Sequence, residues 1–312
     1  MSTSRRKRAV LLFLSAIVSA AVVVTTQSVL FLVPLFLLTA VPLPVMLPIA
    51  GIVMVVSVGV GRFWKMVFGV RASVPIVVLL HLSFIWGFYV SVVRPVVSTV
   101  PDVIFHTECA LLMVGLYSIV NGDPGFATAS GFELEETGYS ESNIHHNGGG
   151  SQFSRIRQCS SCKASVRGFD HHCHAFGNCI GEKNRLLFLI LLIGFILTEA
   201  SYTIFSFHYI KVFFNVSNYW LQRTISGNLV ISTMLFSSIQ VLWQVVFLMW
   251  HLYCVCFNIR TDEWVNWKRY PEFQLTIHKQ ELGENSNDIR FRNPYDKGLL
   301  SNIFDFLFTT TR

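Results

Sequence analysis

Residues 159–179 read CSSCKASVRGFDHHCHAFGNC and hold four of the chain's seven cysteines. Cys159 and Cys162 form a C-x2-C pair, which places two thiols on one tight turn. His172 and Cys179 can complete the set from a second segment. Zinc takes four ligands in a tetrahedron, and three cysteines with one histidine form a common structural set. The spacing therefore predicts one small domain whose folding energy comes largely from a bound zinc ion.

Spacing leaves two other arrangements open. In one, the histidines are spare and all four cysteines bind zinc, namely Cys159, Cys162, Cys173 and Cys179; in the other, the thiols bind no metal. If His172 is a ligand, Cys173 remains free and is held in place by its neighbour. His171 can then accept the proton of Cys173, and Asp170 can hold His171 in one tautomer. Nucleophile, base and orienting group then lie within four residues, a pattern typical of a reactive thiolate.

The composition of the whole chain points to a lipid bilayer. Of 312 residues, 52% are hydrophobic and 13% are charged, against roughly 25% charged residues in an ordinary soluble domain. The mean hydropathy is +0.52, too high for one soluble core, so membrane spans are expected. The net charge of +6 does not indicate nucleic acid, because the basic residues cluster beside apolar runs.

Apolar runs predict about six transmembrane helices. The first run, 9–60, is long enough for two spans of about 20 residues each. Its prolines mark the break or kinks: Pro34, Pro42, Pro44 and Pro48. The four later runs cover about 74–97, 103–120, 186–207 and 229–254.

Lysine and arginine predict the orientation of these spans. Residues 5–8 read RRKR and place the N-terminus in the cytosol. Six spans then put a basic loop over 62–72, the polar segment 121–184 and the tail 257–312 on the same side. Cytosolic cysteines rarely form disulfides, which favours metal binding or catalysis.

The stretch CSSCKASVRGFDHHCHAFGNCIGEKN resembles the cysteine-rich domain of the DHHC family of protein S-acyltransferases, also called palmitoyltransferases. Further motifs of the family match in order over about residues 74–302. They are Asp123, Pro124 and Gly125 in NGDPGF, Thr261 and Glu263 in NIRTDEW (the family's Thr-Thr-x-Glu), and Tyr295 and Asn302 in NPYDKGLLSN.

The resemblance implies a fold of four transmembrane helices with the zinc domain between the second and third. With two additional N-terminal spans, the expected class is an all-α integral membrane protein of about six transmembrane helices with a small cytosolic zinc-binding domain. The expected regions are 1–72 (two extra spans), 73–120 (first two core helices), 121–184 (linker and cysteine-rich domain), 185–256 (last two core helices) and 257–312 (cytosolic tail).

The resemblance also implies an activity and its partners. Cys173 would take a fatty acyl group, typically palmitoyl, from acyl-CoA and pass it to a cytosolic cysteine of a membrane-associated protein. His171 and Asp170 match the family's base and orienting group. The structural zinc would be held by Cys159, Cys162, His172 and Cys179. The family's commonest location is the Golgi or endoplasmic reticulum membrane. The phosphates of CoA need positive charge, for which the candidates are Arg155, Arg157, Lys163, Arg167, Lys183 and Arg185.

The chain departs from the family at its second zinc site. Gln158 and Ser165 stand where that site has a histidine and a cysteine. Its upstream cysteine pair is replaced by a polar linker, 140–154, that holds His145 and His146. One zinc ion is therefore expected instead of two.

Other departures lie closer to the thiol. His174 and Ala175 replace the Pro-Trp that usually follows the active cysteine, and Arg260 replaces the first threonine of Thr-Thr-x-Glu. A catalytically weak or inactive, zinc-stabilised membrane adaptor is thus the alternative function. Four residues of the fifth span fall on one helix face, and they either line an acyl-chain cavity or pack against a neighbouring helix: Phe188, Leu191, Phe195 and Thr198.

Overall fold

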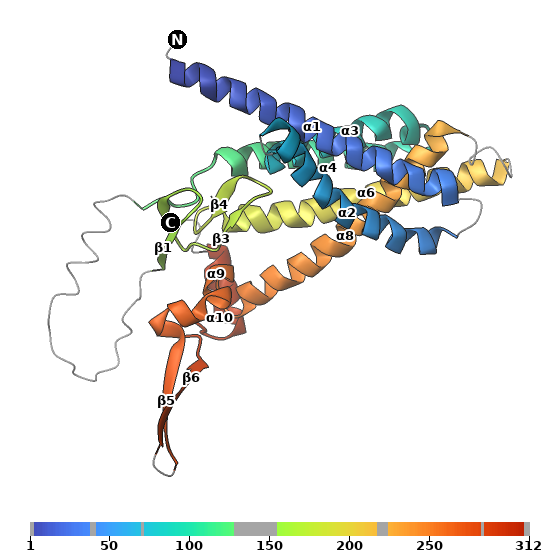
Figure 1. The fold of residues 1–312 in the computed structure, drawn as a ribbon. Helices are drawn as coiled ribbons and strands as arrows, with labels where there is room; N and C mark the ends of the chain where they lie inside the picture. The colour runs from blue at the N-terminus through green and yellow to red at the C-terminus, as the bar shows by residue number, and fades with distance from the viewer. Residues whose placement is uncertain are drawn as a thin grey trace. The chain divides into compact units, whose positions relative to one another are not determined.

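The structure, a computed structural model, describes residues 3–37, 42–69, 72–127, 155–216, 224–281 and 284–308 (Figure 1). The helices are α1 (Thr3–Leu37), α2 (Leu43–Phe68), α3 (Val74–Phe88), α4 (Thr99–Asn121), α6 (Arg185–Val216), α8 (Ile225–Cys256), α9 (Thr261–Val265) and α10 (Leu299–Phe308). The strands are β1 (Ile156–Cys159), β2 (Ala164–Arg167), β3 (His171–Cys173), β4 (Asn178–Ile180), β5 (Gln274–Glu281) and β6 (Glu284–Phe291). The expected linker, with His145 and His146, lies outside the described residues.

The chain forms two compact units. The first contains Met1–Val120, His174–Gly177 and Leu191–Phe247, and the second contains Asn121–Cys173, Asn178–Ile190 and Leu248–Arg312. The first unit is a set of apolar helices. The second unit carries the cysteine-rich segment and the tail, so every residue of the candidate site below belongs to it.

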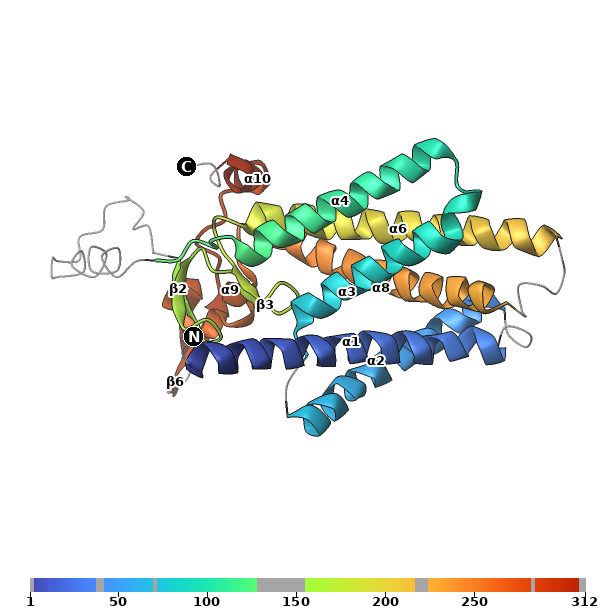
Figure 2. The same cartoon turned by 90° about the horizontal axis from the view of Figure 1, so that it is seen from above.

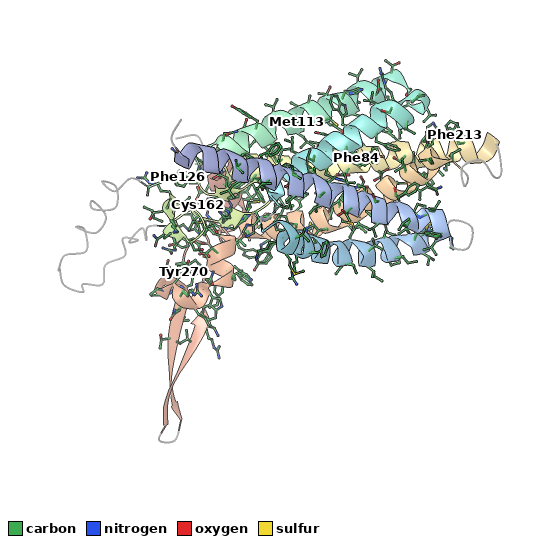
Figure 3. The ribbon with its side chains drawn as sticks, turned by 45° about the horizontal axis from the view of Figure 1, so that its top comes forward. Phe84, Met113, Phe126, Cys162, Phe213 and Tyr270 are labelled. Atoms are coloured by element: carbon green, nitrogen blue, oxygen red, sulfur yellow. The ribbon has the colours of Figure 1, made fainter. Side chains whose placement is uncertain are left out.

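Five helices of the described residues are long and apolar enough to cross a membrane. They are Val10–Leu37, Val74–Val96, Thr99–Asn121, Arg185–Phe213 and Ile225–Cys256. Apolar side chains such as Met113 and Phe213 project from them and remain exposed, as suits contact with lipid tails (Figure 3). The prediction of a helical membrane protein is confirmed to this extent. The sixth span stays a prediction, because the apolar stretch of α2 that is described, Pro44–Val56, is shorter.

The break between the first two helices lies where two of the prolines fall. The helix α2 begins just after Pro42 and carries Pro44 in its first turn, where a missing N–H costs nothing. Figure 2 shows α1 and α2 side by side. The basic residues Arg62 and Lys65, expected in a loop, lie in α2 instead. That helix continues to Gly69, whose left-handed backbone (φ 65°) closes it by binding the Lys65 carbonyl.

Close helix contacts in the first unit depend on small and hydroxyl side chains. A Cβ atom on Gly115 of α4 would lie 2.4 Å from Cδ2 of Leu191 on α6, so any other residue at 115 would force the Leu191 side chain to shift. Tyr202 of α6 and Thr233 of α8 share a hydrogen bond of 2.7 Å between their hydroxyl groups. Both are usual ways to hold helices together in lipid.

Three two-stranded antiparallel sheets depart from the expected all-α class. β1 pairs with β2, β3 with β4, and β5 with β6. The four strands of the cysteine-rich segment are only three or four residues long, too short for a periodic pattern to stand out in the sequence. They fix which side chains of this segment face one another.

Candidate metal and thiol site

The C-x2-C pair lies on the turn that joins β1 to β2. The N–H of Lys163 donates to the Cys159 carbonyl at 2.8 Å, and Lys163 adopts a left-handed backbone (φ 54°). Within this turn the N–H of Cys162 donates to the Cys159 sulfur at 3.4 Å. The turn therefore aims both thiols at one point.

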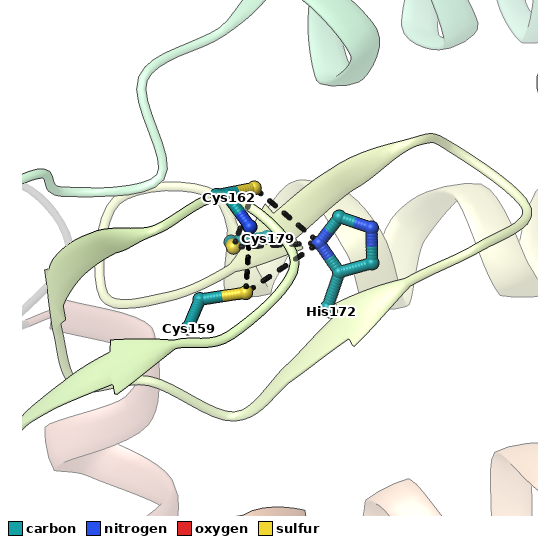
Figure 4. Close-up of side chains that lie close together, drawn as sticks. All are labelled: Cys159, Cys162, His172 and Cys179. Carbon is teal, nitrogen blue, oxygen red and sulfur yellow. Dashed lines mark hydrogen bonds between the residues drawn. The ribbon is translucent and has the colours of Figure 1, made fainter.

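The other two candidate ligands lie opposite each other in the second hairpin. His172 of β3 pairs with Cys179 of β4. Nδ1 of His172 lies 3.7 Å from the Cys159 sulfur, 3.4 Å from that of Cys162 and 3.7 Å from that of Cys179 (Figure 4). The sulfurs of Cys162 and Cys179 are 3.4 Å apart. The four ligand atoms all lie within 4.8 Å of one another.

These distances fit a zinc ion. A tetrahedron with Zn–S bonds of about 2.3 Å and a Zn–N bond of about 2.0 Å has edges of roughly 3.5–3.8 Å, close to the separations of 3.4 and 3.7 Å in the structure. Without a cation, burial and the neighbouring thiols Cys162 and Cys159 raise the pKa of the Cys179 thiol. A metal removes that penalty by binding the thiolates. Cys173 is not part of the group, so the geometry favours His172 over Cys173 as the fourth ligand.

Strand geometry explains this division of roles. Successive side chains of a strand point to opposite faces. His172 therefore faces the metal group, whereas its neighbours His171 and Cys173 share the other face of β3. One three-residue strand thus separates a ligand from a buried thiol and an imidazole.

Asp170, just before that strand, is fully buried and surrounded by donors. Nδ1 of His171 donates to its Oδ2 at 2.8 Å. Thr261 donates its hydroxyl to Oδ2 at 3.0 Å and its N–H to Oδ1 at 3.1 Å, and Nε of Arg185 lies 3.6 Å from Oδ1. Burial alone would raise the pKa of Asp170, but the His171 hydrogen bond and the Arg185 charge hold that pKa below its usual range. Asp170 is therefore a carboxylate.

The imidazole of His171 is poised between this carboxylate and the thiol. Burial would lower its pKa, but hydrogen bonding and charge from Asp170 and Cys173 raise it to about 9. With Nδ1 turned to Asp170, Nε2 is left for the thiol side. Nε2 has no hydrogen bond of normal geometry among the described residues, so its contact with Cys173 is a loose one, as is common before a substrate binds.

His251 was not identified from the sequence, and Phe188 was named only as a member of the stripe on the fifth span. The rings of Phe188 and His251 pack on His171, with centroids 5.3 and 5.6 Å from its own, and lie 4.8 Å from each other. Nδ1 of His251 is 4.0 Å from Oδ2 of Asp170. An ionisable residue in an otherwise apolar span is a signal of function, and His251 could have been singled out on that ground.

The basic residues expected to attract phosphates differ in what they contact. Arg155 binds both oxygens of Glu263, at 2.8 and 2.7 Å, and stacks 3.8 Å above the Tyr295 ring. Arg157 binds Glu272 and lies over the ring of Tyr270. These two guanidinium groups therefore hold the cysteine-rich segment to the tail within the second unit.

The other four candidates are more varied. Arg185 is buried and donates to the Ile259 carbonyl at 3.1 Å, besides facing Asp170. Lys183 forms an ion pair of 2.7 Å with Asp123. Lys163 and Arg167 are exposed. Their role toward a phosphate stays a prediction.

The Asp-Pro-Gly motif makes a turn that docks beside the second hairpin. Oδ1 of Asp123 accepts the N–H groups of Gly125 and Phe126 at 2.8 and 2.9 Å. A Cβ atom on Gly181 would lie 2.4 Å from the Pro124 carbonyl oxygen, so this approach requires glycine at 181. The motif thus braces the end of β4.

Asn302 of α10 ties the tail to the end of α8. Its side-chain amide donates to the Cys256 carbonyl at 2.8 Å and to Asp296 at 2.7 Å, and it accepts the Lys297 N–H at 3.0 Å. The residue is 1% exposed. The last carbonyls of a helix lack partners inside the helix, so this amide acts as a cap.

We expect Asn302→Ala to destabilise the second unit by about 1–3 kcal/mol, because buried groups lose their partners. The measurement is protease sensitivity of the tail, with the exposed Leu300→Ala as the matched control on the same helix. Equal sensitivity of the two variants would contradict this role of Asn302.

Comparison with known proteins agrees with the resemblance. Residues 149–268 match the family described as DHHC palmitoyltransferase. The chain is 28% identical over 160 residues to "Palmitoyltransferase ZDHHC17" of Mus musculus, which covers 49% of this chain and 24% of that protein. It is 30% identical over 156 residues to "Probable protein S-acyltransferase 2" of Arabidopsis thaliana (49% and 32%) and 30% identical over 152 residues to "Palmitoyltransferase ZDHHC12" of Homo sapiens (49% and 50%). The matched part therefore spans between a quarter and a half of the length of these relatives.

Proposed function

Because residues 149–268 match the family described as DHHC palmitoyltransferase, we propose that the chain is a protein S-acyltransferase that uses Cys173 as its nucleophile. One observation carries the proposal. The strand β3 turns His172 toward the metal group and leaves His171 and Cys173 together on the opposite face. A buried thiol beside an imidazole that is itself held by a carboxylate is an arrangement for nucleophilic catalysis.

The first step forms an acyl-enzyme. With a pKa of about 9, the His171 imidazole carries a proton at neutral pH and stabilises the Cys173 thiolate beside it. The thiolate attacks the thioester carbonyl of acyl-CoA, the bond from the acyl carbon to the CoA sulfur breaks, and the CoA thiolate takes the proton from His171. Asp170 keeps the ring in the tautomer and orientation that this transfer needs.

The second step releases the acyl group to a protein. An acceptor cysteine gives its proton to His171 as its sulfur attacks the acyl carbon, and Cys173 leaves as a thiolate. Zinc would be held by Cys159, Cys162, His172 and Cys179. It would stabilise the fold of this segment and would not take part in the acyl transfer. The acceptors are membrane-associated proteins with cysteines on the cytosolic side, and the membrane is that of the Golgi or endoplasmic reticulum.

The test is acylation of the purified protein in detergent or nanodiscs. After incubation with labelled palmitoyl-CoA, we expect one hydroxylamine-sensitive thioester, located at Cys173 by mass spectrometry. A chase with a cysteine-containing acceptor peptide should remove it at a rate proportional to peptide concentration. Absence of label from a protein that retains zinc would reject the enzyme and favour the adaptor.

The elevated pKa of His171 predicts how stability depends on pH. The folded value of about 9 lies above the unfolded value of about 6.5. The stabilising contribution is therefore complete below pH 6.5 and is lost as the pH rises through 9. We expect the unfolding free energy of wild type to exceed that of His171→Gln by an amount that shrinks, by on the order of 3 kcal/mol, between pH 6.5 and 9.5. A difference that stays constant over this range, measured by denaturant titration, would reject the charged imidazole.

A further inference from the structure

Arginines outnumber carboxylates in the core of the second unit. Arg155, Arg185 and Arg260 lie close enough to Asp170 and Glu263 for all five charges to interact. The structure already satisfies both carboxylates. Glu263 accepts hydrogen bonds from Nε and Nη2 of Arg155 and from the backbone N–H of Arg260, the last at 2.8 Å. Asp170 is bound by His171, Thr261 and Arg185, as described above. No carboxylate of this cluster remains for the third guanidinium.

The guanidinium of Arg260 is the one left over. Among the residues that the structure describes, no hydrogen bond or ion pair of its side chain is found, and its Nε is buried without a partner. Its Nη2 lies beside Gly168, 3.3 Å from where a Cβ atom would stand. The residue as a whole is partly exposed. Burial and the positive charges of Arg185 and Arg155 lower the pKa of Arg260 well below its usual value.

An uncompensated buried cation is costly, and an anion from outside removes the cost. We propose that Arg260 forms a phosphate-binding subsite next to the thiol site and that, if the chain is an S-acyltransferase, the subsite takes a phosphate of acyl-CoA. A guanidinium matches phosphate oxygens with two parallel hydrogen bonds.

The position of Arg260 supports this assignment. The next residue, Thr261, donates two hydrogen bonds to Asp170, so the subsite is one residue away from the groups around His171. The family's Thr-Thr-x-Glu motif has a threonine at the position of Arg260. The proposed subsite is therefore a feature in which this chain differs from the motif. Arg260 also lies four residues beyond Cys256, where the last span ends, which makes a lipid headgroup the other source of phosphate to be tested.

The first experiment measures binding of CoA to the Cys173→Ser protein in nanodiscs of neutral lipid. This background carries no acyl group, so binding does not depend on turnover. We expect Arg260→Gln to weaken CoA binding about tenfold or more, as the loss of a charged hydrogen bond implies. Arg260→Lys keeps the charge but not the two parallel hydrogen bonds, so its affinity should fall between those of the parent and Arg260→Gln. The exposed Arg269→Gln should match the parent. Pantetheine, which lacks the phosphates, should bind all four proteins equally weakly.

The second experiment measures the unfolding temperature, because the Arg260 side chain has no hydrogen-bond partner among the described residues. Without CoA, Arg260→Gln should unfold at a higher temperature than its parent, because burial and the charges of Arg185 and Arg155 outweigh the attraction of Asp170 and Glu263 for the Arg260 cation. With CoA, the gain in unfolding temperature should be smaller for Arg260→Gln than for the parent. A structural arginine would give the reverse result, since its loss lowers stability and leaves the effect of CoA unchanged.

Three results would overturn the subsite. One is equal affinity of CoA for Arg260→Gln and its parent, with zinc retained in both. Another is equal affinity of wild type for CoA and pantetheine, which needs no variant and so holds even if Arg260→Gln does not fold. The third is an effect of Arg260→Gln seen only as weaker binding of anionic-lipid vesicles. If wild type transfers no acyl group but its binding of CoA still depends on Arg260, the proposed function is rejected and the subsite is retained.

Discussion

Replacing Cys173 by serine should abolish the hydroxylamine-sensitive acyl label while leaving zinc content at the wild-type level. The hydroxyl is a far weaker nucleophile than the thiolate, and we expect a loss of at least about 10³-fold in label formation. Zinc should stay, because Cys173 lies on the face of β3 opposite to His172 and outside the group of ligand atoms. Mass spectrometry and metal analysis of the same preparation measure both quantities.

The half-buried Cys256 provides the control for this substitution. It lies at the end of α8 and belongs to neither the metal group nor the face of His171, so Cys256→Ser should label like wild type. Loss of zinc from Cys173→Ser would make Cys173 a metal ligand and end the acyl-transfer proposal. Label that persists in Cys173→Ser would move the nucleophile to another cysteine.

Replacing a single zinc ligand should remove the metal, in contrast to Cys173→Ser, which should retain it. Cys179 is fully buried, pairs with His172 across the hairpin and lies 3.4 Å from the Cys162 sulfur. Cys179→Ser should therefore lose the metal and unfold the cysteine-rich segment, since structural zinc contributes roughly 10–16 kcal/mol to the folding of small zinc domains. Hydrogen exchange of residues 155–190 is the measurement, with strong protection in wild type and little in the variant.

Cys173→Ser is the matched control, because it is the same chemical change six residues away in the same hairpin. A chelator applied to wild type should reproduce the exchange pattern of Cys179→Ser, and added zinc should reverse it. Full protection of Cys179→Ser, or protection that survives removal of the metal, would show that the two hairpins fold without the ion.

The local part of this architecture could be predicted from the sequence. Spans were predictable because a bilayer requires long apolar helices. A break among the prolines of 34–48 was predictable because proline is suited to the first turn of a helix, where Pro44 lies. The spacing of Cys159, Cys162, His172 and Cys179 named the four side chains that the structure brings together. Each of these features depends on residues close together in the chain.

What the sequence could not supply were contacts between distant segments. Arg155 and Arg157 were expected to meet phosphates, yet Glu263 and Glu272, more than a hundred positions later, bind them. At Arg260 the sequence shows only the loss of the family's threonine, whereas the structure leaves the side chain of this arginine without a hydrogen-bond partner among the described residues. His251 and Phe188 pack on His171 from two different helices. The alternation of side chains along β3, by contrast, follows from the sequence HHC alone if these residues form a strand.

The anchoring of Asp170 by Thr261 has a consequence for the order of events during synthesis. Residues 170–173 leave the ribosome about ninety positions before the threonine that completes the shell of Asp170. Until α8 has been made and Thr261 has emerged, Asp170 lacks two of its donors, and His171 lacks the aromatic neighbour on α8. Cys173 is thus synthesised early, but the groups that activate it are complete only after Thr261 has been synthesised. A nascent chain, or one truncated before residue 261, should bind its metal while Cys173 remains unreactive toward acyl-CoA.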